Sequence, residues 1–199
     1  MPRVTALRPA RLGRVLVELD GKRWRALPLE VAARTALSVG LELDRERLRA
    51  LRRELRRSEA LAAGSRALSH RDRSEQGLRR ALDNKGVTEE HREEAVRTLK
   101  RLGAVDDERF AHARAASLAE RGWGNAAIAS SLELESVGGE LASLALAELE
   151  PERDRAARFA ARRGGGVRAA RWLEARGFEP HAIEAAVPGI AESDGVELG

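Results

Sequence analysis

The side chains that usually carry catalysis or bind metals are scarce and scattered in this sequence. It has no cysteine, which excludes a thiolate nucleophile, a thiolate metal site and a disulfide. The four histidines fall in separate helix-like segments, at His70, His91, His112 and His181. The acidic run around His91 does not match the His-Glu-x-x-His pattern of a zinc site, and we interpret it as the first turn of a helix that Thr88 caps. We therefore expect no enzyme activity, no metal and no cofactor.

Two glycine-rich stretches have the composition of phosphate-binding loops but lack their signatures. Residues 163–168 read Arg-Gly-Gly-Gly-Val-Arg, without the Gly-Lys-Ser/Thr that a Walker loop requires. Residues 121–124 read Arg-Gly-Trp-Gly, and the strand that precedes a dinucleotide-binding loop is missing. We interpret both stretches as breaks between helices, and we keep their flanking arginines as candidates for contact with a partner.

Aromatic residues make up only 3% of the chain, with no tyrosine. A sequence-tolerant binder of single-stranded nucleic acid normally stacks bases on several exposed rings, so this composition does not favour that function. We expect Trp172 to lie in the core, whereas Trp123, between two glycines, can be either buried or exposed.

Arginine dominates the positive charge, and the charge is arranged in blocks. The chain has 36 Lys and Arg against 32 Asp and Glu, for a formal net charge of +4. Residues 45–80 hold 12 basic against 5 acidic residues, residues 130–154 hold 1 against 7, and residues 153–176 hold 8 against 2. Guanidinium groups bind phosphate and carboxylate alike. The alternation favours docking on a surface that itself alternates in sign, because plain DNA binding favours a uniform positive stripe.

The first 43 residues carry the strand signals of the chain. Three runs are strand-like: 4–7, 14–19 and 22–27. Asp20-Gly21 favours a two-residue hairpin between the last two runs, since both positions of such a turn tolerate a positive φ. Pro28 can open a short helix over 29–38, which Gly40 would stop. This predicts a small ββα unit over 1–43, too small for a core of its own and packed on the chain beyond residue 43.

From Asp44 onward the sequence predicts helices. Asp44 can cap a helix whose leucines recur at three- and four-residue spacing, at Leu48, Leu51 and Leu55. The arginines around that stripe form either a solvated face or a contact surface for a polyanion. Both interpretations stay open.

The remainder repeats one pattern three times. In each unit a first helix leads to a second helix that opens at a small or capping residue, then to a turn followed by an apolar residue, and then to a third helix. The turns lie near Gly86, Ser136 and Gly177. A period of roughly 40 to 50 residues is typical of helical arrays, which expose a long curved surface. We predict a mainly α fold of three tandem three-helix (helix-turn-helix-like) repeats in an elongated curved array.

The predicted boundaries follow from these patterns. They are 1–43 for the N-terminal unit, 44–105 for the arginine-rich helix with the first repeat, 106–152 for the second repeat, 153–188 for the third and 189–199 for a disordered acidic tail. No apolar run reaches the length of a membrane span, and the first residues lack the apolar stretch of a signal peptide. We expect a cytoplasmic monomer that does not bind membranes.

Four motifs, in order across residues 60–187, resemble the RecX family of RecA regulators. They are Ser-Glu-Gln-x-Leu-Arg-Arg-x-Leu at 74–82 with Lys-Gly at 85–86, Leu-Gly-Ala-Val-Asp-Asp-Glu-Arg-Phe-Ala at 102–111, Arg-Gly-Trp-Gly-x-x-x-Ile at 121–128, and Arg-Trp-Leu-x-x-Arg-Gly-Phe at 171–178. The resemblance implies a non-catalytic protein that binds RecA, lies in the groove of the RecA–DNA filament, and inhibits its ATPase and strand exchange. The alternative is a helical-repeat DNA-binding protein or transcriptional repressor that acts on DNA directly.

We expect the contacts with RecA carboxylates or DNA phosphates at basic residues of these motifs and turns. They are Arg73, Arg79, Arg80, Lys85, Arg121, Arg163, Arg168, Arg171 and Arg176. Glu75 and the acidic run at 106–108 are expected to cap helices. Two positions depart from the family pattern. Gly77 stands where a glutamate would close a capping box on Ser74, and the turn at Ser136 lacks the basic residue of the other two turns, which weakens the case for filament contact there.

Overall fold

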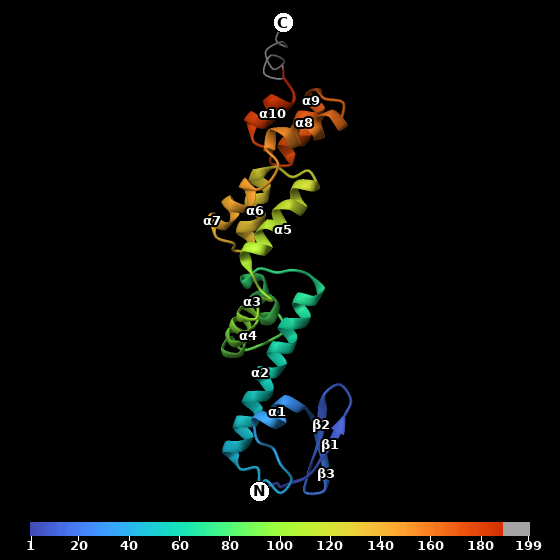
Figure 1. Ribbon diagram of the computed structural model, residues 1–199, viewed down its shortest axis with the longest axis vertical. Helices are drawn as coiled ribbons and strands as arrows, with labels where there is room; N and C mark the ends of the chain where they lie inside the picture. Colours follow the sequence, from blue (N-terminus) through green and yellow to red (C-terminus); the bar gives the residue numbers. More distant parts are fainter. Residues whose placement is uncertain (189–199) are drawn as a thin grey trace. The chain divides into compact units, whose positions relative to one another are not determined.

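The computed structural model describes residues 1–188, which form a small antiparallel sheet followed by ten helices (Figure 1). The strands are β1 (Val4–Ala10), β2 (Arg14–Leu19) and β3 (Lys22–Pro28), in the order β1-β2-β3. The mainly helical fold with a small N-terminal sheet is confirmed. The expected ββα unit has a third strand, because β1 pairs along β2 from Val4 opposite Leu19 to Ala10 opposite Arg14.

The turn between β2 and β3 has the predicted geometry. Asp20 and Gly21 have φ values of 49° and 77°, as a two-residue hairpin loop with two left-handed positions requires. The N–H of Gly21 donates to Thr5 Oγ1 at 2.9 Å, so the loop is also tied to β1.

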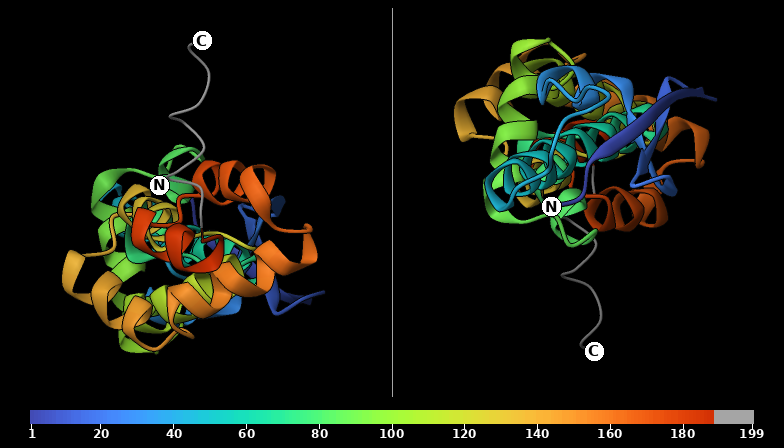
Figure 2. Two further views of the ribbon diagram at one scale, coloured as in Figure 1. Left: turned by 90° about the horizontal axis from the view of Figure 1, so that it is seen from above. Right: turned by 90° about the horizontal axis from the view of Figure 1, so that it is seen from below.

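Helix α2 completes the core of the N-terminal unit. The sheet lies beside the short helix α1 (Leu29–Arg34) and the long helix α2 (Arg45–His70) (Figure 1, Figure 2). Val17 and Leu27 of the sheet are fully buried in one cluster with Leu51 and Leu55 of α2. The unit therefore packs on the next segment of the chain, as expected.

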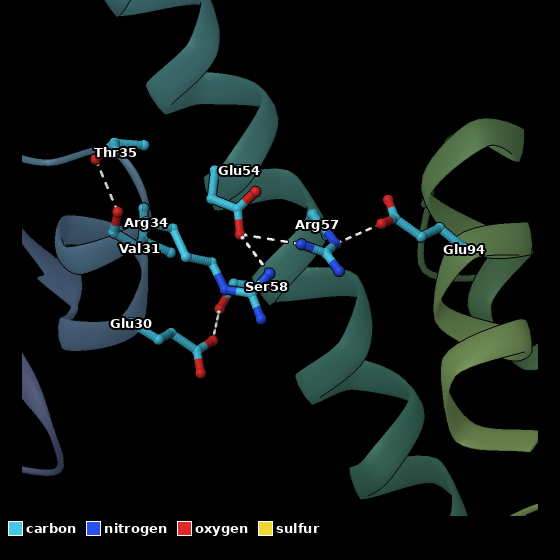
Figure 3. Close-up of polar contacts among 8 residues, drawn as sticks. All are labelled: Glu30, Val31, Arg34, Thr35, Glu54, Arg57, Ser58 and Glu94. Atoms are coloured by element: carbon cyan, nitrogen blue, oxygen red, sulfur yellow. Dashed lines mark hydrogen bonds and ion pairs between the residues drawn. The ribbon is translucent and has the colours of Figure 1, made fainter. Parts of the chain in front are cut away.

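Polar side chains at the middle of α2 connect it to a helix on either side (Figure 3). Ser58 donates to Glu30 of α1 at 2.6 Å. Arg57 pairs with Glu54 on its own helix and with Glu94 of α4 (Glu89–Arg101). The arginine-rich helix predicted from Asp44 and the first helix of the first repeat are thus one continuous helix of 26 residues, which Asp44 caps by accepting from Arg47 N at 2.7 Å.

The remaining helices follow the predicted threefold pattern. They are α3 (Glu75–Asp83) and α4 in the first repeat, α5 (Asp107–Glu120), α6 (Asn125–Leu134) and α7 (Gly139–Ala147) in the second, and α8 (Glu152–Arg162), α9 (Gly166–Ala175) and α10 (Pro180–Ala186) in the third. The end of α2 supplies the first helix of the first repeat. Helical repeats are confirmed, and the curvature of the array stays a prediction.

The turns after α3, α6 and α9 have one geometry. Their central residues Gly86, Ser136 and Gly177 have φ values of 71°, 58° and 71°. The N–H of the next residue returns to the carbonyl of a buried leucine: Val87 to Leu82, Val137 to Leu132 and Phe178 to Leu173, at 3.0–3.2 Å. This left-handed turn closes the end of each helix and directs an apolar side chain toward the core.

The chain divides into two compact units. Unit 1 comprises Met1–Arg71 and Leu78–Ala104, and unit 2 comprises Asp72–Gly77 and the chain from Val105 onward. Unit 1 holds the sheet and most of the first repeat, and unit 2 holds the second and third repeats. Within residues 1–188, the helices lack the combination of length and apolarity that a membrane span needs. The predicted acidic tail at 189–199 lies outside the described residues.

Candidate partner-binding surface

Two of the sequence motifs meet in unit 2 and join the second repeat to the third. We call the loop residues 121–126 and 176–178 the repeat junction. The N–H of Gly124 donates to Arg176 O at 2.9 Å, and that of Ala126 donates to Gly177 O at 3.2 Å. A Cβ on Gly124 would lie 2.2 Å from Gly177 O and from Phe178 N, a distance that backbone atoms do not tolerate. Gly124 therefore serves the close approach of two backbones and not a phosphate.

Arginine side chains stack on indole rings beside this junction. The guanidinium of Arg163 lies 3.5 Å from the ring centroid of Trp172, and that of Arg176 lies 4.9 Å from the same centroid. Arg176 also lies 4.6 Å from the centroid of Trp123 and donates to Arg121 O at 3.3 Å. Cation–π contacts of this kind are worth about 0.5–2 kcal/mol each. Two of the predicted contact residues, Arg163 and Arg176, thus also hold the fold together.

The two tryptophans of the junction are both half-buried. Trp172 packs against the core of the third repeat, as expected, and Trp123 packs against the core of the second. The question left open for Trp123 is therefore answered in favour of the core. Its Nε1 is buried and has no hydrogen-bond partner in the described part of the chain.

A buried arginine fastens α8 to the junction. Arg155 is 2% exposed and donates to Glu150 O at 3.0 Å, to Trp123 O at 2.9 Å and to Asn125 Oδ1. Burial lowers the pKa of its guanidinium, and the nearby carboxylates of Glu152 and Glu150 act in the opposite direction. An arginine is essentially always protonated in proteins, so a charge is held in the core by three acceptors.

Glu152, one turn before Arg155, is also buried and binds backbone groups. Its carboxylate accepts from the N–H of Asn125 at 2.5 Å and from that of Glu179 at 3.4 Å. Ligand atoms of Glu152, Glu179 and His181 lie within 4.8 Å of one another. Because both oxygens of Glu152 already accept from N–H groups, we interpret the cluster as a cap of two helix starts.

The burial of these two residues was not predicted, although the sequence carries a signal of it. Positions 152, 155, 156, 159 and 160 follow the i, i+3, i+4, i+7, i+8 spacing of a helix face that packs on a core. Three of these positions hold alanine or phenylalanine, which marks the face as buried. A glutamate and an arginine on the same face are therefore buried as well.

The first motif begins with a cap that also reaches another repeat within unit 2. Ser74 Oγ accepts from Gly77 N at 2.9 Å and donates to Glu135 O at 2.8 Å. Asp107 Oδ1 accepts from Glu75 N at 2.7 Å. A Cβ on Gly77 would lie 3.1 Å from Ser74 Oγ and 3.0 Å from Glu135 Oε2, so a larger residue there would press on the cap hydroxyl and on the Glu135 carboxylate.

Asp106 and Asp107 of the acidic run at 106–108 bind backbone N–H groups, as expected. Asp106 Oδ1 accepts from Arg109 N at 3.0 Å and caps α5, while Asp107 reaches the start of α3. Thr88, in contrast, occupies the N-cap position of α4 but its hydroxyl makes no cap hydrogen bond. The first turn of α4 lacks the side-chain cap that the sequence predicts.

The nine predicted contact residues fall into three groups. Arg79, Arg163 and Arg176 are engaged within the fold; Arg79 Nε donates to both carboxylate oxygens of Glu93 at 3.0–3.1 Å. Arg73 is half-buried and Arg80 is exposed. The remaining four are exposed, and their side chains have no ion pair or hydrogen bond within residues 1–188: Lys85, Arg121, Arg168 and Arg171.

The four exposed cations without an ion pair are available to a partner, and they are distributed over both units. Lys85 lies in unit 1, at the turn between α3 and α4, and the three arginines lie in unit 2. Arg168 and Arg171 are three residues apart on α9, so their side chains lie on the same side of the helix. Such a pair can bind two anionic groups at neighbouring positions of a partner.

Comparisons with known proteins agree with the sequence motifs. Residues 60–99 match the family model for the first three-helix domain of RecX. The crystal structure of a regulatory protein RecX superimposes with a TM-score of 0.76 at 21% identity, over 96% of this chain and 100% of the other. RecX from Lactobacillus salivarius gives a TM-score of 0.58 at 17% identity, over 69% of this chain and 97% of that one. No curated protein matches the chain.

At identities of 21% and 17%, the two superpositions show a shared fold. The match at 60–99 shows similarity in the sequence of the first repeat. The matched segment includes the first of the four motifs on which the resemblance rests, at 74–82 with the turn at 85–86. The resemblance to the RecX family is thereby confirmed: the chain carries the first three-helix domain of that family and has the fold of solved RecX proteins.

Proposed function

We propose that the protein binds RecA, lies in the groove of the RecA–DNA filament, and inhibits the ATPase and strand exchange of RecA. It acts in the cytoplasm without catalysis of its own and modulates recombination and DNA repair. The observation that carries the proposal is the match of residues 60–99 to the first three-helix domain of RecX.

The distribution of available charge supports this function. A filament groove presents protein carboxylates and DNA phosphates together, and guanidinium groups bind both. The exposed cations Lys85, Arg168 and Arg171 stand in two separate units, which suits an extended partner better than a single small ligand. The acidic block at 130–154 lies between the basic blocks in the sequence, and such an alternation suits a surface of mixed sign.

The test is the rate of ATP hydrolysis by the cognate RecA on single-stranded DNA. We expect the protein to slow hydrolysis when it is added well below one molecule per RecA protomer, because a filament regulator acts on many protomers at once. No effect on hydrolysis at any ratio would contradict the proposal. A protein that acts on DNA directly would instead hold naked duplex, with an affinity that falls steeply with salt.

A further inference from the structure

A groove in unit 1 combines several features of an anion site. Its lining side chains come from α2, from the turn between α3 and α4, and from the first turn of α4. We call it the basic groove and define it by Arg56, Glu59, Ala63, Arg66, residues 85–88 and His91. Its volume of about 520 Å³ is in the range of small-molecule and nucleotide sites, roughly 300–1,000 Å³.

The lining of the basic groove carries a net positive charge. Arg56, Arg66 and Lys85 line it, and their side chains make no ion pair or hydrogen bond with any residue of the described chain. Glu59 is the acidic side chain of the lining. Three cations against one carboxylate give the lining a net charge of +2 in a concave surface, where field lines are focused, while Glu89 and Glu90 of the first turn of α4 lie outside the lining.

Backbone donors add to this potential. Helix α4 has 13 residues and begins at the groove with Thr88 in the N-cap position. Because the Thr88 hydroxyl makes no cap hydrogen bond, no side chain of the N-cap satisfies the N–H groups of the first turn. The N-terminus of a helix binds anions through these N–H groups and through the helix dipole.

A buried histidine atom provides an independent sign of a ligand site. His91 lines the groove and is only 6% exposed. Its Nδ1 is buried and has no hydrogen-bond partner in the part of the chain that the structure describes. Buried polar atoms are nearly always paired, so an atom without a partner in the protein calls for an explanation such as contact with a ligand.

We propose that the basic groove binds phosphate groups of a single nucleic acid strand. His91 Nδ1–H and the first N–H groups of α4 donate to the oxygens of one phosphate, and Arg56, Arg66 and Lys85 surround it and its neighbour. A strand supplies phosphates in series, which matches three cations spread along a groove, whereas a protein carboxylate offers a single isolated charge. This proposal rests on the proposed function in one respect, since the RecA–DNA filament is what suggests nucleic acid as the ligand. The lining of the groove comes from this chain alone and does not require RecA.

The experiment is a titration of the full-length protein, labelled with ¹⁵N in its histidines, with a short oligodeoxythymidylate. We expect the side-chain resonances of His91 to shift on binding, while those of the exposed His181 stay in place. Binding of a fluorescent oligonucleotide is measured in parallel by anisotropy at several salt concentrations.

Two groove variants and two matched controls make the test specific. Arg66→Gln and Lys85→Gln each remove an exposed groove cation, and we expect the salt slope of log Kd to fall by about 1 and the affinity at low salt to fall about fivefold. Arg97→Gln and Arg101→Gln remove exposed cations of α4 that do not line the groove, and we expect less than about a twofold change. Thermal unfolding of the four variants checks that the fold is retained.

The outcomes separate this proposal from the proposed function. Unchanged His91 resonances, or groove variants that bind like their controls, would overturn the phosphate site. A His91 shift with polyglutamate but not with the oligonucleotide would overturn it in favour of a protein partner. Inhibition of RecA ATPase by the wild-type protein is measured separately, so loss of the groove proposal leaves the proposed function standing, and the reverse also holds.

Discussion

Arg155 places a guanidinium in the core of unit 2 and satisfies three of its donors there. Buried ions are costly unless they are fully hydrogen-bonded, and removal of one partner leaves the others unpaired. The acceptors of Arg155 are the carbonyl groups of Glu150 and Trp123 and the side chain of Asn125. This side chain therefore holds the segment before α8 and the start of α6 in one arrangement.

We predict that Arg155→Leu lowers the free energy of unfolding by about 3 kcal/mol, since it leaves three partly buried acceptors without their donor. The control is Arg158→Leu on the same helix, where an exposed ion pair with Glu150 is lost. Exposed pairs are worth about 0–1 kcal/mol, so the control should lose less than about 1 kcal/mol. Urea denaturation followed by circular dichroism measures both, and equal losses would show that Arg155 is not a structural anchor.

Single residues differ in how well the sequence predicts them. The caps formed by Ser74 and Asp106 were predictable, because a cap depends on residues three positions apart. The engagement of Arg79 by Glu93 was not, because the two lie 14 residues apart and meet only after α3 and α4 have packed. The arginine types and their blocks are visible in the sequence, but which guanidinium groups remain available depends on tertiary contacts.

At the scale of elements, the recurring left-handed turn explains the threefold pattern. The central residue is glycine in the first and third repeats and serine in the second, although all three have a φ near 60–70°. A residue with a Cβ is strained in this region by about 1 kcal/mol or more, whereas glycine is not.

We predict that Ser136→Gly raises the free energy of unfolding by about 0.5–1 kcal/mol. Glycine removes backbone strain from the folded state, and this gain is larger than the cost of the extra conformational entropy that glycine gives to the unfolded chain. The reciprocal change, Gly86→Ser, should lower it by about 1 kcal/mol. A Cβ on Gly86 would have no atom within 4 Å, so steric clashes do not contribute to the expected change in stability. Thermal and urea unfolding test the pair, and a change of the same sign in both variants would refute the explanation.

The elements themselves were largely predictable, because helical periodicity and turn residues act locally. Two features were not. Helix α2 runs through from Arg45 to His70 although its two halves differ in composition, since no glycine or proline interrupts the chain before Gly64. Gly64 is accommodated because Leu99 of α4 packs where its Cβ would lie, at 2.7 Å. The run 4–7 is strand-like in the sequence, but its extension to Ala10 and its pairing along β2 depend on a partner that a single run of residues does not reveal.

At the scale of the whole molecule, the available cations belong to two compact units. Contacts made by separate units on one filament add their free energies, provided that both can engage at once. Lys85 in unit 1 and the pair Arg168 and Arg171 in unit 2 are the sites at which this can be tested, since none of them stabilises the described fold through an ion pair. Arg79 is unsuitable, because its replacement would also remove an ion pair with Glu93 within the fold.

We predict that Lys85→Gln, and Arg168→Gln combined with Arg171→Gln, each raise the concentration needed to inhibit RecA ATPase by about 3- to 10-fold, the effect of roughly 1 kcal/mol per lost contact. The triple variant should show the product of the two effects. Arg97→Gln serves as the control, which should inhibit like the wild type. If the triple variant inhibits RecA ATPase as well as the less effective of the other two variants, the two units do not act together.

The tryptophans beside the repeat junction make the protein its own optical probe. With no tyrosine in the chain, its ultraviolet emission comes from three indoles. Trp24 of β3 is 40% exposed, while Arg176 contacts the rings of both Trp123 and Trp172. Replacing Trp24 with phenylalanine therefore confines the signal to unit 2. In such a protein, any partner that draws the Arg176 guanidinium away from the indoles changes the emission without an added dye, and binding to the third repeat becomes visible in real time.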